Sequence, residues 1–321
     1  FFFKQKTAYE IPKRDWSSDV CSSDLPYGER ATIGGMVAAN QSGPRRHRYG
    51  TPRDLIIGIE VALTSGLVAR SGGRVVKNVA GYDLARLFCG SYGSLGLITS
   101  VTFKLAPLPA SSRTVVARFA TVEHAAAAAR DLAASPSLTP SAIELLAPDP
   151  RLLVRFESTE RSADLMASAA EGMIRRAATS TAVLRDGPEA AAWTEHERTE
   201  SMPGGLVGMI AVLPTAVGPA AADLARHGAA HGVTWALTGR AALGVLRVHA
   251  SGTPEALQRF ARELRAAIAA HGGRVQFAGA SDILGTTLDR HGSLGSSAGV
   301  ALAVKQRFDP AGVLPYPWTA R

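Results

Sequence analysis

The chain has 321 residues, of which 46% are hydrophobic and 19% are charged, a balance typical of globular proteins rather than disordered ones. This length is enough for two domains, and no apolar run approaches the roughly 20 residues that a membrane-spanning helix needs. The formal net charge of +8 permits attraction to anionic ligands, acidic subunits, nucleic acid or membrane surfaces, although an arginine- and alanine-rich composition also fits a GC-rich genome alone. The two cysteines, Cys21 and Cys89, are too few for a disulfide framework or an internal iron–sulfur cluster, and they fit a reducing compartment.

Residues 1–25 differ in character from everything that follows. They read FFFKQKTAYEIPKRDWSSDVCSSDL and show neither helical nor strand periodicity. They also lack the basic flank and long apolar centre of a secretory signal. The string resembles the translation of a sequencing adapter joined to a broken gene. We therefore expect a non-native segment, or else a disordered tail, with no function of its own.

Residues 31–45, ATIGGMVAANQSGPR, are the most informative segment. An apolar run leads into the paired glycines Gly34 and Gly35. Small residues follow at Ala38, Ala39, Ser42 and Gly43. A backbone without Cβ atoms can press against a flat or phosphorylated ligand. Together with the glycine-punctuated residues 77–83 and 90–96, this segment predicts three loops that hold a cofactor mainly through main-chain atoms.

The first part of the chain predicts short elements around these loops. A strand is expected over residues 54–63, with a turn at residues 64–66. A short helix is expected over residues 82–88, with Asp83 near its start. A second strand over residues 96–105 is stopped by two prolines.

After Pro109 the pattern becomes β-α-β-β-α-β and then repeats. The first pass has strands over residues 113–119, 142–146, 152–156 and 181–184, and helices over 122–134 and 161–178. The second has strands over 207–213, 234–237, 244–249 and 274–277, and helices over 220–231 and 254–271. Two such units predict one mainly antiparallel sheet covered by helices on one face. A Gly- and Ser-rich linker over residues 280–297 then precedes a last helix over 298–308.

Two long motifs carry a family resemblance. The series ATIGGMVAANQSGPRRHRYGTPRD and GGRVVKNVAGYDLARLFCGSYGSLGLITSVTFKLAPLP closely resemble FAD-linked oxidases of the vanillyl-alcohol oxidase type. Within that group, SGPRR and VVKNVAGYDL are similar to the FAD-binding subunit of bacterial glycolate oxidase. The resemblance is dense over residues 27–109, thin in the middle and weak again over 304–313. The ordered combination is specific, whereas each motif alone would be weak.

The resemblance implies an α+β fold, with the C-terminal part of a two-lobed FAD-binding domain plus an α/β cap domain whose sheet is mainly antiparallel. The first lobe of the family's FAD-binding domain has no counterpart here, so we expect an N-terminally truncated chain that is inactive alone. Four segments follow from this prediction. Residues 1–25 are non-native, 26–110 form a partial FAD-binding domain, 111–280 form the cap domain, and 281–321 return to the FAD domain.

By resemblance, residues 32–35 lie along the FAD phosphates and ring, mostly through backbone N–H groups. The predicted FAD-binding residues are Thr32, Ile33, Gly34, Gly35, Asn40, Ser42, Gly43, Asp54, Lys77, Asn78, Gly93, Gly96 and Ile98. Tight turns remain the alternative for the glycines. Lys77 could stabilise negative charge on a reduced flavin or form a surface ion pair. Asp54 is expected to have a structural role beside the cofactor, as a cap or an arginine partner.

The implied activity is that of an FAD-dependent oxidoreductase. The family reaction takes a hydride from the α-carbon of a 2-hydroxy acid, such as glycolate, onto the flavin and gives the 2-oxo acid glyoxylate. Electrons then leave through a larger FAD-linked glycolate oxidase subunit and an iron–sulfur subunit. The catalytic base is not identified, and Arg247 and His249 are either substrate contacts or core-facing residues of a cap strand. The alternatives are a non-redox structural subunit of the same complex and an oxidase of another hydroxy acid such as D-lactate. We expect a cytoplasmic protein, and peripheral association with the inner face of the membrane through the complex stays open.

Other chemistries find less support in the sequence. The basic cluster Arg45, Arg46, His47, Arg48 and Arg53 could bind nucleic-acid phosphates, but Tyr49 is its one aromatic, so a carboxylate substrate or a partner subunit is favoured and no nucleic acid is expected. His227 and His231 lie one helical turn apart with no third ligand indicated, which predicts a solvated helix surface and no metal. The motifs of serine hydrolases, P-loop NTPases and NAD dehydrogenases are missing.

Overall fold

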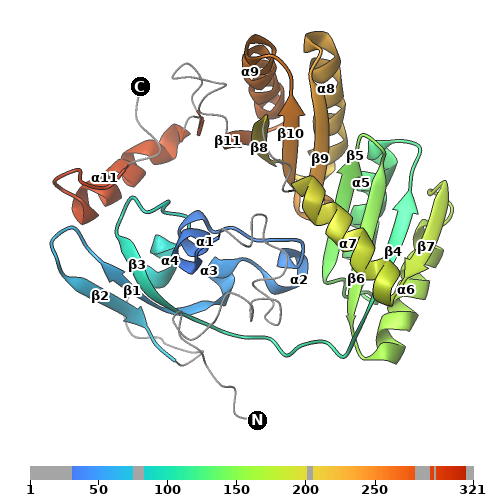
Figure 1. The fold of residues 1–321 in the computed structure, drawn as a ribbon, viewed down its shortest axis with the longest axis horizontal. Coiled ribbons are helices and arrows are strands. Elements are labelled where there is room, and N and C mark those ends of the chain that lie inside the picture. The colour runs from blue at the N-terminus through green and yellow to red at the C-terminus, as the bar shows by residue number, and fades with distance from the viewer. Residues whose placement is uncertain (1–30, 75–82, 201–204, 279–289, 293, 316–321) are drawn as a thin grey trace. The chain divides into compact units, whose positions relative to one another are not determined.

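The computed structural model describes residues 31–74, 83–200, 205–278, 290–292 and 294–315. The predicted non-native segment, most of the linker, and Lys77 and Asn78 lie outside these residues. The chain divides into two units, and Figure 1 labels their helices and strands. Unit 1 comprises residues 1–108 and 293–321, and unit 2 comprises residues 109–292. The predicted boundaries fell at residues 110 and 280.

Unit 1 is a small sheet with short helices. Its strands are β1 (Ile56–Ala62), β2 (Val68–Gly72) and β3 (Leu97–Phe103), in the antiparallel order β2-β1-β3. Its helices are α1 (Ile33–Ala39), α2 (Arg46–Tyr49), α3 (Pro52–Leu55), α4 (Leu84–Phe88) and α11 (Ala298–Phe308), and α11 is preceded by the 3₁₀ turn η4 (Gly295–Ser297). The two strands and the short helix that the sequence predicts here are present, and Asp83 caps α4 as expected.

The C-terminal helix α11 is anchored in unit 1. The ring of Phe308 meets the buried ring of Phe88 edge-on, with centroids 5.5 Å apart. The buried ammonium group of Lys305 donates to the carbonyl oxygens of Ser94 (3.0 Å) and Leu314 (2.8 Å) and pairs with Asp309. Because the lysine has these partners, its charge is satisfied although the side chain is only 8% exposed.

The segment around Gly34 and Gly35 is a helix and not the predicted loop. Thr32 is the N-cap of α1, and its side chain accepts a hydrogen bond from the backbone of Gly35. Met36 and Val37 are buried on the inner face of α1, and Asn40 ends the helix in the left-handed conformation (φ 48°). Capping and burial therefore overcome the low helix propensity of two adjacent glycines.

Unit 2 is built on one eight-stranded antiparallel sheet. In chain order its elements are β4 (Ser111–Arg118), α5 (Val122–Ala134), β5 (Ala142–Ala147), β6 (Arg151–Ser158), α6 (Glu160–Ile174), β7 (Ser180–Leu184), α7 (Asp186–Glu200), β8 (Leu206–Ala211), η2 (Pro214–Ala216), α8 (Val217–His231), β9 (Thr234–Arg240), η3 (Ala241–Leu243), β10 (Val245–Ser251), α9 (Pro254–Ala270) and β11 (Arg274–Ala278). Their order across the sheet is β11-β8-β10-β9-β5-β6-β4-β7. The mainly antiparallel sheet predicted from the sequence is confirmed.

The sheet contains two copies of one topology. Within each β-α-β-β-α-β repeat the strands lie in the order second, third, first, fourth, so that β5-β6-β4-β7 corresponds to β9-β10-β8-β11. The repeats join through their second strands, β5 and β9, which pair antiparallel with Leu145 opposite Gly239. The second strand lies at one edge of each repeat. Pairing of β5 with β9 therefore leaves neither of these two edges exposed.

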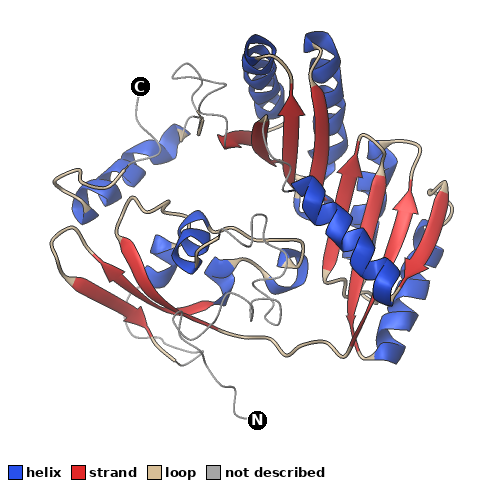
Figure 2. Cartoon of the chain, in the orientation of Figure 1, coloured by secondary structure: helices blue, strands red, loops and turns tan. Residues whose placement is uncertain are grey.

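Helices cover both faces of this sheet, which corrects the expectation of one covered face. Helices α5, α6, α8 and α9 bury the large apolar cluster on one side. Helix α7 crosses the strands on the other side, as Figure 2 shows, where Trp193 packs on Ala142, Leu146 and Leu153. None of the described helices combines the length and apolarity that crossing a membrane requires.

Candidate cofactor site

A hollow of about 500 Å³ lies in unit 1, where α1 faces the segment that leads into β3. Its lining consists of Thr32, Gly34, Gly35, Ala38, Ala39, Tyr92, Gly93, Gly96, Leu97 and Ile98. Six of these, Thr32, Gly34, Gly35, Gly93, Gly96 and Ile98, were predicted as cofactor-binding residues. The two motifs that the sequence singles out therefore form one concave wall made largely of small side chains and main chain.

The start of α1 fixes one side of the hollow. The amide of Gly35 donates to Thr32 Oγ1 (3.1 Å), and the amide of Met36 donates to the Thr32 carbonyl oxygen (2.9 Å). A Cβ atom on Gly35 would stand 2.9 Å from Thr32 Oγ1, so a side chain there would displace the cap. The Gly35 amide is thus engaged within the helix, whereas the prediction had it facing FAD.

The glycines on the opposite wall are also required by the chain itself. Gly93 adopts φ +74°, a left-handed conformation that disfavours other residues. A Cβ atom on Gly96 would stand 2.5 Å from Cγ1 of the buried Val61. These two positions therefore need glycine whether or not a ligand binds.

Gly34 is different. The nearest atoms to a Cβ built at this position are Ile98 O at 3.4 Å and Ile98 Cβ at 3.9 Å, which are ordinary van der Waals separations. Its backbone is helical and needs no positive φ. Packing within the chain therefore leaves room for a methyl group at Gly34, and the missing side chain keeps the wall of the hollow open. A flat cofactor pressed against main chain fits this arrangement.

Four lining residues, Ala38, Ala39, Tyr92 and Leu97, were not among the predicted cofactor-binding residues, although the sequence analysis noted the two alanines as small residues. Tyr92 has φ +53°, and its amide donates to the carbonyl of Ala38 (2.9 Å), which ties the loop to α1. Burial raises the pKa of its phenol, although 41% of the residue remains exposed. Leu97 is 67% exposed. An aromatic residue between two glycines, in GSYGSLG, was the available signal for Tyr92.

Several predicted residues lie behind the hollow and not in its wall. Asn40 accepts a hydrogen bond from the amide of Arg53 through Oδ1 (3.1 Å). Asp54 Oδ2 accepts from both the amide and the hydroxyl of Thr51 (2.8 Å each), and the backbone hydrogen bond is the main cause that lowers the pKa of this carboxyl. Asn40 and Asp54 thus hold α1 and α3 in place.

The remaining predicted residues of unit 1 are also outside the lining. Ile33 packs against the apolar core, Ser42 is half-buried, and the carbonyl of Gly43 accepts from the amide of Arg46 (3.1 Å). In the basic cluster, Arg48 stacks 5.6 Å from the ring centroid of Tyr49, and burial lowers the pKa of His47. The structure therefore brings none of this cluster into the hollow.

Unit 2 carries a second concentration of polar groups beneath α7. Arg247 and His249 lie on the strand face that α7 covers and are only 7% and 4% exposed, so neither faces the main apolar core. His249 Nε2 lies 3.0 Å from the carbonyl oxygen of Glu200, and burial lowers the pKa of this imidazole. Buried polar groups of this kind need partners, and Glu200 of α7 supplies one to His249.

The same layer holds a fully buried ionic cluster. Arg240 Nε lies 3.3 Å from Glu144 Oε1, and Arg240 Nη2 lies 3.3 Å from Glu200 Oε1. His196 Nε2 lies 3.1 Å from Glu144 Oε2. Burial alone would lower the pKa of His196, but its hydrogen bond and charge interaction with Glu144 outweigh burial and raise it.

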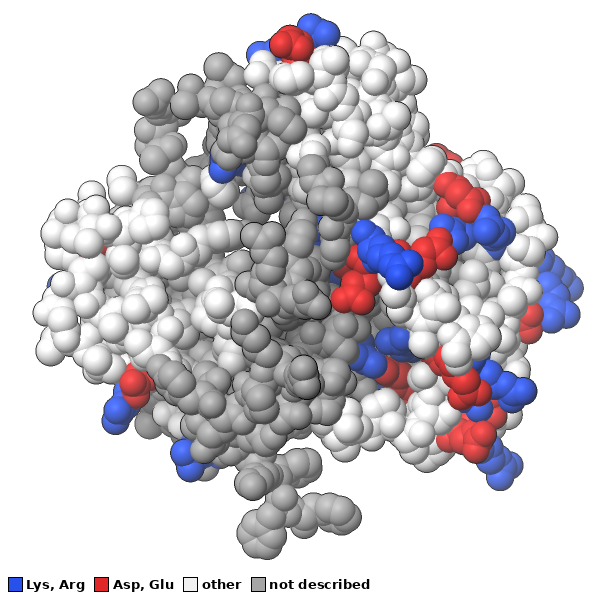
Figure 3. Space-filling view, viewed as in Figure 1, with Lys and Arg blue, Asp and Glu red and all other residues white. Residues whose placement is uncertain are grey.

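The charges on the visible surface are mixed. In Figure 3, positive and negative side chains alternate over unit 2 and form no stripe of one sign. Arg118 and Arg151 share Asp149, and Arg151 also pairs with Glu195. Ion pairing between neighbours thus accounts for these charges, whereas a nucleic-acid interface would require a basic stripe.

On the helix layer of unit 2, His227 and His231 do not form the solvated surface that was expected. Their side chains are only 11% and 13% exposed, and both rings face Glu263 of α9. Sequence reasoning did not identify this carboxylate, because it lies on a separate helix.

Comparisons with known proteins agree with the site in unit 1. A model of the FAD binding domain matches residues 22–72. The chain is 43% identical over 124 residues to glycolate oxidase subunit GlcD of Bacillus subtilis, which is 39% of this chain and 26% of that protein. It is 51% identical over 86 residues to glycolate oxidase subunit GlcE of Escherichia coli, 27% of this chain and 25% of that protein.

Two further similarities complete this result. The mitochondrial D-lactate dehydrogenase (cytochrome) of Arabidopsis thaliana is 46% identical over 102 residues, 32% of this chain and 18% of that protein. A solved structure of alkyldihydroxyacetonephosphate synthase superposes with a TM-score of 0.65 at 17% identity, covering 92% of this chain and 60% of that one. This likeness concerns the fold, and it agrees with the predicted α+β architecture that contains a mainly antiparallel sheet.

The chain spans about a quarter of the length of the two glycolate oxidase subunits that it matches. The match to the FAD binding domain includes the α1 side of the hollow, residues 32–39, and the other side, residues 92–98, lies outside the matched residues. FAD is the cofactor that the matches indicate, and the predicted resemblance of this chain to FAD-linked oxidases of the glycolate oxidase type is confirmed.

Proposed function

We propose that this chain is part of an FAD-dependent oxidoreductase that oxidises a small 2-hydroxy acid. The observation that carries the proposal is the hollow in unit 1, where α1, which lies within the match to the FAD binding domain, faces the glycine-rich residues 92–98. The relatives support the substrate class, because the names of glycolate oxidase and D-lactate dehydrogenase both specify 2-hydroxy acids.

The residues of the hollow suit the role of holding FAD. Gly34, Ala38 and Ala39 on α1 offer a wall without large side chains, and Gly93 and Gly96 do the same opposite. Tyr92 is a partly exposed aromatic residue in the lining, and its backbone amide ties the loop to Ala38 of α1. When bound, FAD would supply the acceptor for the hydride that leaves the α-carbon of the hydroxy acid.

Glycolate is the first substrate to test, with glyoxylate as the product. Of the three relatives above, the glycolate oxidase subunit GlcE has the highest identity to this chain. Similarity to two different subunits of glycolate oxidase also supports a multi-subunit assembly. We propose a larger FAD-linked subunit and an iron–sulfur subunit as its partners, the latter because the cysteines of this chain are too few for a cluster.

The proposal is tested by adding FAD to the purified full chain and following flavin absorbance through gel filtration. Because the chain alone is expected to be inactive, the activity is tested after reconstitution with the larger FAD-linked subunit and the iron–sulfur subunit of a glycolate oxidase. Under anaerobic conditions, glycolate or D-lactate should bleach the flavin of this complex, whereas acetate, which lacks the hydroxyl group, should leave it unchanged. A reconstituted complex that retains FAD but responds to no 2-hydroxy acid would contradict the proposed activity. A folded chain that retains no FAD would favour the structural-subunit alternative.

A further inference from the structure

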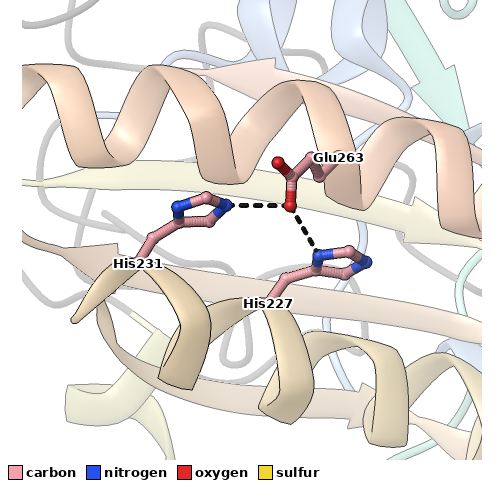
Figure 4. A group of neighbouring side chains, drawn as sticks. All are labelled: His227, His231 and Glu263. Atoms are coloured by element: carbon pink, nitrogen blue, oxygen red, sulfur yellow. Dashed lines mark hydrogen bonds and ion pairs between the residues drawn. The ribbon is translucent and has the colours of Figure 1, made fainter.

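The helix layer of unit 2 contains a group of three metal-ligand side chains. Helices α8 and α9 lie side by side, and His227 and His231 project from one face of α8 because they are four residues apart. Figure 4 shows both rings directed at Glu263 of α9. His227 Nδ1 lies 2.9 Å from Glu263 Oε2, and His231 Nε2 lies 2.8 Å from the same oxygen.

The three potential ligand atoms, two imidazole nitrogens and one carboxylate oxygen, all lie within 4.8 Å of one another. Around a tetrahedral zinc ion with bonds of about 2.0–2.1 Å, neighbouring ligand atoms stand about 3.3 Å apart. The two nitrogen–oxygen distances therefore need to open by about 0.5 Å to admit such an ion, and the nitrogen–nitrogen separation, which is at most 4.8 Å, has to reach about 3.3 Å. Glu263 is the side chain that can move, since it is 47% exposed whereas the imidazoles are largely buried.

Glu263 is engaged by the two imidazoles. In the described part of the chain its ion pairs are with His227 and His231, and none is with a lysine or arginine. The cluster of Glu144, His196 and Glu200 beneath α7 is the opposite case. There Arg240 already lies against both carboxylates, so a metal ion would meet a buried positive charge.

We infer that His227, His231 and Glu263 form a binding site for a divalent transition-metal ion of the zinc class. Imidazole and carboxylate ligands suit zinc, nickel, cobalt and copper, and three protein ligands leave a position for water. The bound ion cross-links α8 to α9. The site lies on the helix layer, on the opposite side of the sheet from α7, so the bound ion stabilises unit 2.

The test uses the full chain after treatment with a chelator. Equilibrium dialysis against zinc sulfate, followed by metal analysis, should give one zinc ion per chain, and zinc should raise the Tm. The variants His231→Gln and Glu263→Gln should each weaken zinc binding at least tenfold, equivalent to about 1.4 kcal/mol. His271→Gln is the matched control, because His271 pairs with a single carboxylate, Asp223 (2.8 Å), and belongs to no three-ligand group.

The control variant should bind zinc like the parent chain. The site is refuted if the chain binds no zinc, or if Glu263→Gln binds zinc as tightly as the parent. Equal loss of binding in His271→Gln would also overturn it, since the affinity would then come from scattered histidines. Circular dichroism checks each variant for folding, and the exposed position of Glu263 makes its substitution the least disruptive to packing.

Discussion

Replacing Gly34 by alanine should separate the stability of unit 1 from its affinity for FAD. The new Cβ atom would stand 3.4 Å from Ile98 O, a normal contact, in a helical backbone. Alanine in place of glycine in a helix interior stabilises the fold by about 0.5–1 kcal/mol. Because Gly34 is the second residue of α1, we expect a gain at the lower end of this range. The free energy of unfolding should therefore stay the same or rise slightly.

The same methyl group would project from the wall of the hollow. If FAD lies against this wall, the overlap should cost about 1–3 kcal/mol, as overpacking does in a close-packed site. The dissociation constant for FAD should then rise about 5- to 150-fold. Calorimetric titration with FAD gives the affinity, and urea unfolding gives the stability.

Gly299→Ala is the matched control for this experiment. Gly299 is also the second residue of a helix in unit 1, α11, and a Cβ atom there meets nothing within 4 Å. It does not line the hollow, so its substitution should leave FAD affinity unchanged. The reasoning fails if Gly34→Ala binds FAD like the parent chain. It fails equally if Gly34→Ala unfolds more easily, because an internal packing requirement would then explain the glycine.

Three further outcomes are expected. Gly96→Ala should destabilise unit 1 by about 1–3 kcal/mol in urea unfolding, because its Cβ would lie 2.5 Å from Val61 Cγ1; an unchanged midpoint would contradict the packing described. Burial raises the pKa of Cys89 to about 11, so iodoacetamide should label this thiol much more slowly in the native chain than in urea at about pH 8, as read by peptide mass spectrometry; equal rates would count against it. The pKa of His196 is raised in the fold, so its charged form contributes stability that is complete below its ordinary value of 6.5 and is lost as pH rises through the folded pKa. Unfolding at about pH 6 and about pH 9 should show this loss, and His196→Gln should reduce it.

The sequence predicted the elements that carry both an apolar pattern and clear end signals. Helix α5 runs over Val122–Ala134 as expected, because Thr121 caps its start and a stripe of alanines faces the core. Helix α11 also has its predicted bounds, Ala298–Phe308. Edge strand β2 was missed, since its residues are mostly exposed and show no apolar alternation.

Helix α7 was missed for a different physical reason. Its inward-facing residues are Glu189, Trp193, His196 and Glu200, which have helical spacing but are mostly polar. They are buried because they contact polar side chains on the face of the sheet that α7 covers. Glu189 accepts a hydrogen bond from Thr114 Oγ1 (2.7 Å), and the indole of Trp193 donates to the same hydroxyl (2.9 Å). A search for hydrophobic periodicity cannot find such a helix, because its partners lie far away in sequence.

The candidate site shows the same division between local and non-local information. The motifs identified the two segments of the hollow, since short glycine-rich stretches are visible in sequence. They did not separate Asn40 and Asp54, which brace the helices, from the residues that form the wall. That distinction depends on which way each residue faces once α1 and α3 have packed.

The glycines make this point most sharply. Gly35 protects a helix cap, Gly93 allows a left-handed turn, and Gly96 makes room for Val61, so each would be retained in a protein with no cofactor. Gly34 has no such internal reason, yet it lies in the same wall. In the sequence it differs in no way from its neighbour Gly35. Only the geometry shows that the space beside Gly34 is left for something outside the chain, which is why the FAD assignment is best tested at this residue.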